Sequence, residues 1–246
     1  RPGLGGPDRP GLGGPDRPGL GGPDRPGLGG GDRSVHAPIL SADAQVSVYS
    51  TDGFFAETFV ENVQSLSAVP QRESHPWLVP VGKAYRLTVH PSPVDRYISV
   101  NYLQRDVPDG YEHALGLYFL ADGETTWQPV ADSTALVENL AVGRLDERSG
   151  VYAVMASVEL PQLLPGWNLF AYPLPVSRPV EVALASIADC YGPVISPATV
   201  PSAGPVQPGA GTAAELLEPN RVYWVYITGD EPVSLRLAPP TRGPDG

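Results

Sequence analysis

The chain has 246 residues, including 30 Pro and 28 Gly, and its net charge is −11. Proline and glycine together are about twice as frequent as usual, but glycine does not recur at every third residue, which excludes a collagen helix. The acidic balance argues against binding to nucleic-acid phosphates or anionic lipid, and no apolar run approaches the ~18 residues of a membrane span.

Residues 1–33 form the first predicted segment, an arm of octapeptide repeats. RPGLGGPD occurs at 1–8, 9–16 and 17–24, and RPGLGGGD follows at 25–32. Each Pro-Gly favours a turn, and one Leu per repeat cannot build a core. Two interpretations stay open: a linker or stalk, or a docking arm that becomes ordered on a neighbouring subunit. In the second, the self-assembly contacts are Leu4, Leu12, Leu20 and Leu28.

Residues 34–160 show the pattern of a β-sandwich. Apolar and polar residues alternate at 85–89 and 97–102, and 115–120 has the composition of a more buried strand. About seven to nine short strands, separated by Pro-, Gly- and Asp-rich turns, are typical of a sandwich. No long helical pattern interrupts them, so we expect a mainly β fold.

Residues 161–240 predict a small α+β module, followed by a tail at 241–246. A strand is expected at 167–172, and apolar spacing predicts a helix from Val180 to Ile187 with Ser177 as its N-cap. A Pro-rich loop should occupy 193–211. Thr212 and Glu215 have capping-box spacing for a short helical turn. The β-prone segment 222–228 and residues 233–237 predict the last strands.

A family resemblance rests on three stretches of this module. They are Trp167-Asn168-Leu169 with Tyr172-Pro173, Arg178-Pro179-Val180 with Ala183-Leu184-Ala185-Ser186-Ile187, and Tyr223-Trp224-Val225. They resemble a module that follows a β-sandwich in bacterial secreted and cell-surface proteins. Val222 stands where that module often has Gly, and the 193–211 loop lacks its usual aspartates and aromatics. The resemblance implies export and display, and it implies no chemistry.

No motif in the chain indicates catalysis. The histidines do not form a ligand pattern, and there is no nucleophile elbow, phosphate loop or dinucleotide fingerprint; the histidines are His36, His75, His90 and His113. Cys190 is the only cysteine, so no intrachain disulfide or cysteine zinc site can form. Acidic turns at 122–124, 106–109 and 230–231 fit hairpin turns better than calcium sites. We therefore expect no enzyme activity, no metal and no cofactor.

The four tryptophans leave two interpretations open. Their rings could stack on sugars, and Trp77 and Trp127 are the candidates for such a ligand site. Most of the tryptophans lie in apolar strand contexts, where packing in the core is the commoner role. Three of the four tryptophans lie in such contexts, so we predict a core role for most of them.

These observations together predict an exported structural protein. We expect a subunit of a bacterial surface polymer or filament, located extracellularly or on the cell surface, whose arm contacts other copies of the chain. Because the chain opens inside a repeat at Arg1 without a signal peptide, we expect a mature or trimmed product. The alternative is an adhesin or carbohydrate-binding protein on a flexible stalk, with glycans or the cell envelope as partners. No nucleic-acid partner is expected.

Overall fold

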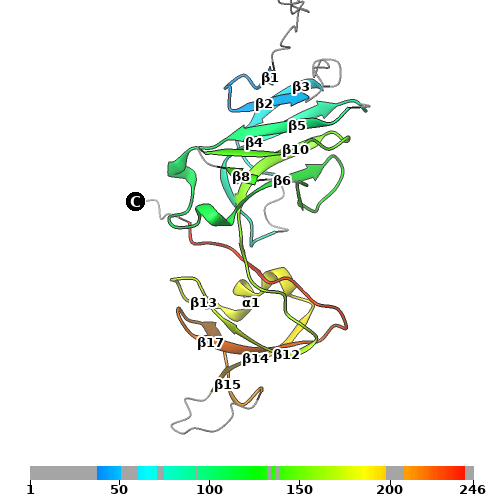
Figure 1. The fold of residues 1–246 in the computed structure, drawn as a ribbon. Helices are drawn as coiled ribbons and strands as arrows, with labels where there is room; N and C mark the ends of the chain where they lie inside the picture. Colours follow the sequence, from blue (N-terminus) through cyan, green and yellow to red (C-terminus); the bar gives the residue numbers. More distant parts are fainter. Residues whose placement is uncertain are drawn as a thin grey trace, which may run out of the picture. The chain divides into compact units, whose positions relative to one another are not determined.

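The computed structural model describes residues 38–246 except 51–59, 71–74, 92–93, 132–133, 137–138, 198–207 and 242–246. The arm with its four Leu, His36 and nearly all of the predicted tail therefore lie outside the described residues. The described chain is built mostly from antiparallel strands, which confirms the prediction of a mainly β fold (Figure 1).

The first sheet of the sandwich has five antiparallel strands. In spatial order they are β1 (Ile39–Leu40), β2 (Val46–Ser50), β5 (Arg96–Asn101), β9 (Leu140–Arg144) and β8 (Thr134–Leu136). Alternation places Val46 and Val48 of β2 inward, and Val48 pairs with the buried Ile98 of β5.

The second sheet also has five antiparallel strands. Their spatial order is β3 (Val60–Leu66), β4 (Val79–Val89), β10 (Gly150–Ala156), β6 (Leu115–Ala121) and β7 (Gln128–Pro129). The sequence pattern did not predict β3, because most of its residues are polar or exposed. Two short 3-10 helices, η3 (Gln104–Asp106) and η4 (Glu112–Ala114), lie between β5 and β6.

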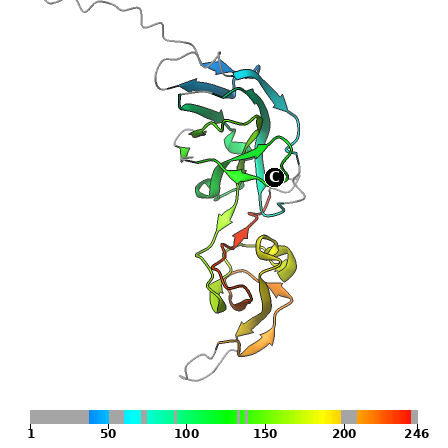
Figure 2. The same cartoon turned by 90° about the vertical axis from the view of Figure 1, so that its right-hand side faces the viewer.

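The strands of the two sheets are drawn in blue to green in Figure 2. Residues from both sheets share one hydrophobic core, which is the expected arrangement of a sandwich. Val48 and Ile98 from the first sheet and Leu87, Leu117 and Tyr152 from the second are all buried in it. A separate cluster packs on residues of the second sheet that point away from this core; it contains Leu78, Ala84, Tyr118, Leu120, Trp127, Val151, Ala153 and Met155. Strand β10 is consequently buried along its whole length.

The C-terminal part is organised around a four-stranded antiparallel sheet. Its strands, in order, are β12 (Gly166–Ala171), β17 (Val222–Ile227), β14 (Tyr191–Pro197) and β15 (Gly211–Ala213). Two small ribbons accompany it: β13 (Arg178–Pro179) with β16 (Leu216–Leu217), and β11 (Val158–Glu159) with β18 (Arg236–Leu237).

One face of this sheet is covered by the helical segment. Val180, Leu184 and Ile187 share a core with Tyr223 and Val225 of β17. Figure 1 shows α1 (Val180–Ala183) next to the sheet that contains β12, β14 and β17. The opposite face of the sheet has no such cover among the described residues, and this difference creates the candidate site.

Four local predictions in this part were wrong. The helix ends after Ala183 and continues as a 3-10 turn, η5 (Ala185–Ile187), because Leu184 leaves helical geometry. Pro179, without a side-chain cap, takes the N-cap position that Ser177 was expected to fill. Thr212 lies in strand β15, and the predicted loop begins as strand β14, so tertiary pairing overrides the local signals. The division of the chain at residue 160 stays a prediction.

Candidate functional site

The candidate site follows from the way side chains alternate between the two faces of strand β17. Tyr223, Val225 and Ile227 are buried against the helical segment. Val222, Trp224 and Tyr226 occupy the alternate positions and therefore project from the opposite face of the sheet. Because both sets are apolar, β17 has a hydrophobic face toward the core and a second hydrophobic face directed away from it.

The neighbouring strands extend this outward face. Trp167 of β12 pairs with Tyr226, and Leu169 pairs with Trp224. On the other side of β17, Ile195 of β14 also pairs with Trp224. Directly opposed residues lie on the same side of a sheet with Cβ atoms about 5 Å apart, so these side chains form a continuous patch. We call it the aromatic face, and it consists of Trp167, Leu169, Ile195, Val222, Trp224 and Tyr226.

Much of the aromatic face is exposed. The exposed fractions are 37% for Trp167, 52% for Leu169, 46% for Val222 and 38% for Tyr226. Single exposed apolar residues are common, but a clustered apolar patch usually marks an interaction site. These four residues are neighbours in the sheet, so they qualify as such a cluster.

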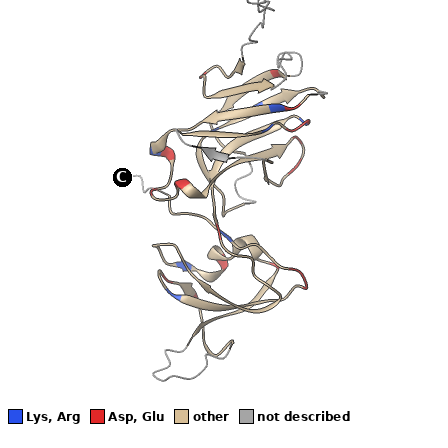
Figure 3. Ribbon diagram, viewed as in Figure 1, with Lys and Arg blue, Asp and Glu red and all other residues tan. Residues whose placement is uncertain are grey.

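The sheet that bears this face carries no charge. None of the strands β12, β14, β15 and β17 contains Asp, Glu, Lys or Arg. In Figure 3 these strands are tan along most of their length. Close to the sheet, Arg221 pairs with Glu218 at 3.1 Å. An uncharged centre with charge at its edge is the pattern of a contact surface rather than of an ordinary solvated face.

The rings of the aromatic face are partly ordered by their neighbours. Trp167 and Tyr226 meet edge to face, with ring centroids 5.3 Å apart. Gly209 lies so close to Trp167 that a Cβ atom on it would be 2.5 Å from the indole ring. The indole nitrogen of Trp224 is buried and has no hydrogen-bond partner among the described residues. This N–H is a donor that a rearranged or bound acceptor would satisfy.

A second candidate is a hollow in the sandwich between β6, β7, β9 and β10. Its volume is about 490 Å³, and Phe119, Gln128, Arg144, Asp146 and Tyr152 are among the residues that line it. Its polar side chains are already paired: Arg144 with Asp95, and Gln128 with Glu124. Paired side chains of this kind indicate a structural site.

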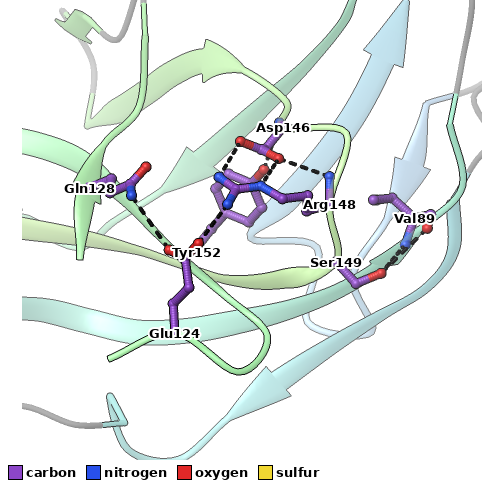
Figure 4. Close-up of polar contacts among 7 residues, drawn as sticks. All are labelled: Val89, Glu124, Gln128, Asp146, Arg148, Ser149 and Tyr152. Atoms are coloured by element: carbon purple, nitrogen blue, oxygen red, sulfur yellow. Dashed lines mark hydrogen bonds and ion pairs between the residues drawn. The ribbon is translucent and has the colours of Figure 1, made fainter. Parts of the chain in front are cut away.

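Arg148 is the centre of that structural site, as Figure 4 shows. Its guanidinium donates to both carboxylate oxygens of Asp146, at 2.9 and 3.1 Å, and to Oε1 of Glu124 at 2.7 Å. It also lies 5.5 Å from the centre of the Phe119 ring. Hydrogen bonds with Arg148 lower the pKa of Asp146, and those with Asp146 raise the pKa of Arg148. The cluster thereby joins the turn before β10 to the turn after β6.

The predicted ligand-stacking tryptophans lie apart from the aromatic face in the fold. Trp127 is buried, and its indole nitrogen donates to the carbonyl of Pro70 at 3.4 Å. Trp77 is half-buried against the hydrophobic cluster that contains Trp127, and its ring meets His75 edge to face. A buried ring presents no face to a sugar, so Trp127 does not support the stacking role. The predicted arm contacts lie outside the described residues.

Two of the histidines and the acidic turn at 122–124 have contacts or neighbours in the described part of the chain. His90 lies 3.7 Å from Glu61 at the surface, and burial lowers the pKa of His75. Asp122 pairs with Arg86, and Glu124 with Arg148. Among the described residues no three His, Cys, Asp or Glu side chains are grouped as metal ligands would be.

No protein-family model matches the sequence, and no match was found among the curated proteins or the solved structures. In the described parts of the chain, no helix has the length and apolar character needed to cross a membrane. The resemblance to bacterial surface modules therefore rests on the sequence stretches alone.

The sequence predicted strands β12 and β17 of the aromatic face, but it assigned most of β14 to a loop and favoured a core role for most of the tryptophans. The signal that could have corrected this is in the segment VYWVYI, where every position is apolar. A strand buried on one face alternates polar and apolar residues. A strand that is apolar on both faces would need other parts of the protein to pack on each face if both are to be buried. Among the described residues, the helical segment at 180–187 covers one of these two faces.

Proposed function

We propose that this protein is an exported structural subunit of a bacterial surface polymer or filament, and that the aromatic face is one of its contact surfaces. The observation that carries the proposal is the uncharged sheet with Trp167, Leu169, Val222 and Tyr226 exposed side by side. Export and display follow from the resemblance to bacterial surface modules.

Burial of this face would favour association. Apolar surface removed from water contributes about 25 cal/mol per Å², and Trp and Tyr are the residues that most often dominate binding energy. Trp167 and Tyr226 already constrain one another's rings, so little side-chain freedom would be lost on contact. The ion pair of Arg221 and Glu218 could then serve as part of a polar rim.

The repeat arm supplies the second half of the proposal. An arm that leaves one subunit and contacts the next makes a head-to-tail contact, and such contacts propagate into open filaments unless a ring closes. The four identical repeats offer Leu4, Leu12, Leu20 and Leu28 as equivalent contacts. The arm alone would lose too much chain entropy to become ordered, so it requires a partner surface.

The proposal is tested by the assembly state of the full chain. Sedimentation velocity and negative-stain electron microscopy should show polymers that grow with protein concentration. The double variant Leu169→Thr/Tyr226→Thr places Thr, a residue with high strand propensity, in both strands and should abolish or shorten the polymer. Leu103→Thr alters an apolar residue that is 43% exposed in the sandwich and should leave assembly unchanged. A chain that stays monomeric at every concentration would contradict the proposal.

One observation favours the alternative, an adhesin or carbohydrate-binding protein. Exposed indole and phenol rings stack on the apolar faces of sugars, and Trp167 and Tyr226 present such rings side by side. The partner would then be a glycan or another component of a cell envelope. Binding of the monomeric chain to a glycan array, lost in Leu169→Thr/Tyr226→Thr, would favour this alternative over a polymer subunit.

A further inference from the structure

The chain already places one Pro-Gly segment of its own on the aromatic face. Residues 208–211 read Pro-Gly-Ala-Gly, and the backbone of Gly209 rests directly on the indole of Trp167. Any Cβ at this position would collide with the ring, and φ at Gly209 is +72°, a backbone conformation that other residues rarely adopt. Only glycine combines this close approach with this backbone conformation.

The arm repeats the same sequence pattern four times. Pro-Gly-Leu-Gly occurs at 2–5, 10–13, 18–21 and 26–29, and it differs from residues 208–211 only by Leu in place of Ala. A backbone that can lie on an indole at Gly209 can do so at the equivalent glycine of each repeat. Leucine then adds an apolar side chain that the segment at 208–211 lacks.

The exposed part of the aromatic face is complementary to the Leu and Pro side chains of a Pro-Gly-Leu-Gly segment. Leu169 and Val222 are about half exposed and could receive a Leu side chain. Trp167 and Tyr226 offer rings against which a proline can pack, as in the aromatic grooves that bind Pro-rich peptides. An extended Pro-rich segment has no internal hydrogen bonds, so its backbone carbonyls stay free to accept hydrogen bonds from water at the edge of the face.

We propose that the aromatic face binds the Pro-Gly-Leu-Gly segments of the arm of a neighbouring copy. This inference deepens the proposed function, because it names the surface that receives the arm. The face is a better receptor than a sheet edge, since proline lacks the N–H that strand addition requires. Consecutive repeats lie about 25 Å apart in an extended proline-rich helix, so one arm can engage several faces and gain avidity.

The test uses a labelled synthetic peptide of residues 1–32 and the full chain. The receptor is the full-length variant with Leu4, Leu12, Leu20 and Leu28 changed to Ser, so that its own arm competes less for the face. Fluorescence anisotropy should show saturable binding of the peptide. The same peptide with its four Leu changed to Ser should bind at least about tenfold more weakly, as expected for the loss of buried Leu contacts.

Matched receptor variants locate the site. Adding Leu169→Thr/Tyr226→Thr should weaken peptide binding by about tenfold or more, whereas adding Leu103→Thr should not change it. Each variant is checked by circular dichroism and thermal unfolding, so that loss of fold is distinguished from loss of the site. No binding, or equal binding to the face variant, overturns the inference.

A parallel assay separates this inference from the proposed function. If the full chain assembles through the face, but excess peptide neither binds nor inhibits assembly, the proposed function stands and the inference is wrong. If the full chain is monomeric at every concentration and the peptide still binds the face, the inference stands and the proposed function as a polymer subunit is wrong. Inhibition of assembly by the peptide, but not by its Leu→Ser form, supports both.

Discussion

Asp43, in the turn between β1 and β2, links the stability of the sandwich to pH. Its carboxylate accepts hydrogen bonds from Ser41, the backbone of Gln45, Lys83 and Tyr85. Burial raises the pKa of Asp43, but the hydrogen bonds from Ser41 and Lys83 outweigh it and lower the pKa to about 2. A depressed folded-state pKa means that the ionised group stabilises the fold above pH ~4 and loses this effect between pH ~4 and ~2.

We expect Asp43→Asn to lower the free energy of unfolding at pH 7 by about 1 kcal/mol, after allowance for solvent screening of the half-exposed Lys83. The difference from the unmodified chain should disappear as the pH falls from about 4 to about 2. Urea unfolding at several pH values measures it. A difference that persists unchanged at pH ~2 would show that the charge of Asp43 is not its source.

Tyr152 holds the turn that carries Asp146, the ion-pair partner of Arg148. Its side chain is fully buried, and its hydroxyl accepts the backbone N–H of Asp146 at 2.8 Å. Tyr152→Phe removes that acceptor and should lower the free energy of unfolding by about 1 kcal/mol. Tyr97→Phe is the control, because the Tyr97 hydroxyl makes no hydrogen bond to a described residue. Equal urea midpoints for the two variants would contradict this role of Tyr152.

Strand β10 is the element on which the second sheet depends most. It lies between β4 and β6, and it is buried on both faces. At its start, a Cβ atom on Gly150 would lie 2.3 Å from the carbonyl oxygen of Leu120. The close pairing of β10 with β6 therefore requires glycine there.

Gly150→Ala should destabilise the chain by about 2 kcal/mol, the cost of forcing an extra carbon into a packed core. Gly229→Ala is the matched control, since the nearest atom to its added Cβ is the Glu231 backbone nitrogen at 4.0 Å. Thermal unfolding of both variants is the measurement. A Gly150→Ala chain as stable as Gly229→Ala would mean that β6 and β10 can separate without cost.

Elements with a one-sided apolar pattern could be predicted from the sequence, and others could not. Strand β5 alternates clearly, and its predicted span differs from the observed one by a residue at each end. Strand β3 is largely polar, so periodicity gave no signal for it. The helix was predicted too long because its spacing also fits a short turn followed by a 3-10 segment.

Sequence patterns left the candidate site unassigned for a different reason. Alternation assigns residues to two faces of a strand, but it does not say which face the rest of the chain covers. In β17 both faces are apolar, so Tyr223 and Trp224 look equally suited to the core. Only the position of the helical segment shows that Tyr223 is buried and that Trp224 belongs to the other face.

At the scale of the whole molecule, assembly through the aromatic face requires that apolar contacts outweigh charge repulsion between subunits. The chain has a net charge of −11, whereas the aromatic face has none. Raising the salt concentration from about 0.05 M to about 0.5 M screens the repulsion and leaves apolar contacts intact. Assembly measured by light scattering should therefore stay constant or increase. Dissociation at high salt would indicate that ion pairs hold the subunits together.

The most direct test of the central claim compares the full chain with a chain that lacks residues 1–32. The described cores lie entirely within residues 38–246, so the shortened chain should retain its circular dichroism and melting temperature. Sedimentation velocity and electron microscopy at matched concentrations should show polymers of the full chain and none, or much shorter ones, of the shortened chain. Equal assembly of the two chains would mean that the arm is only a linker, and it would contradict the account.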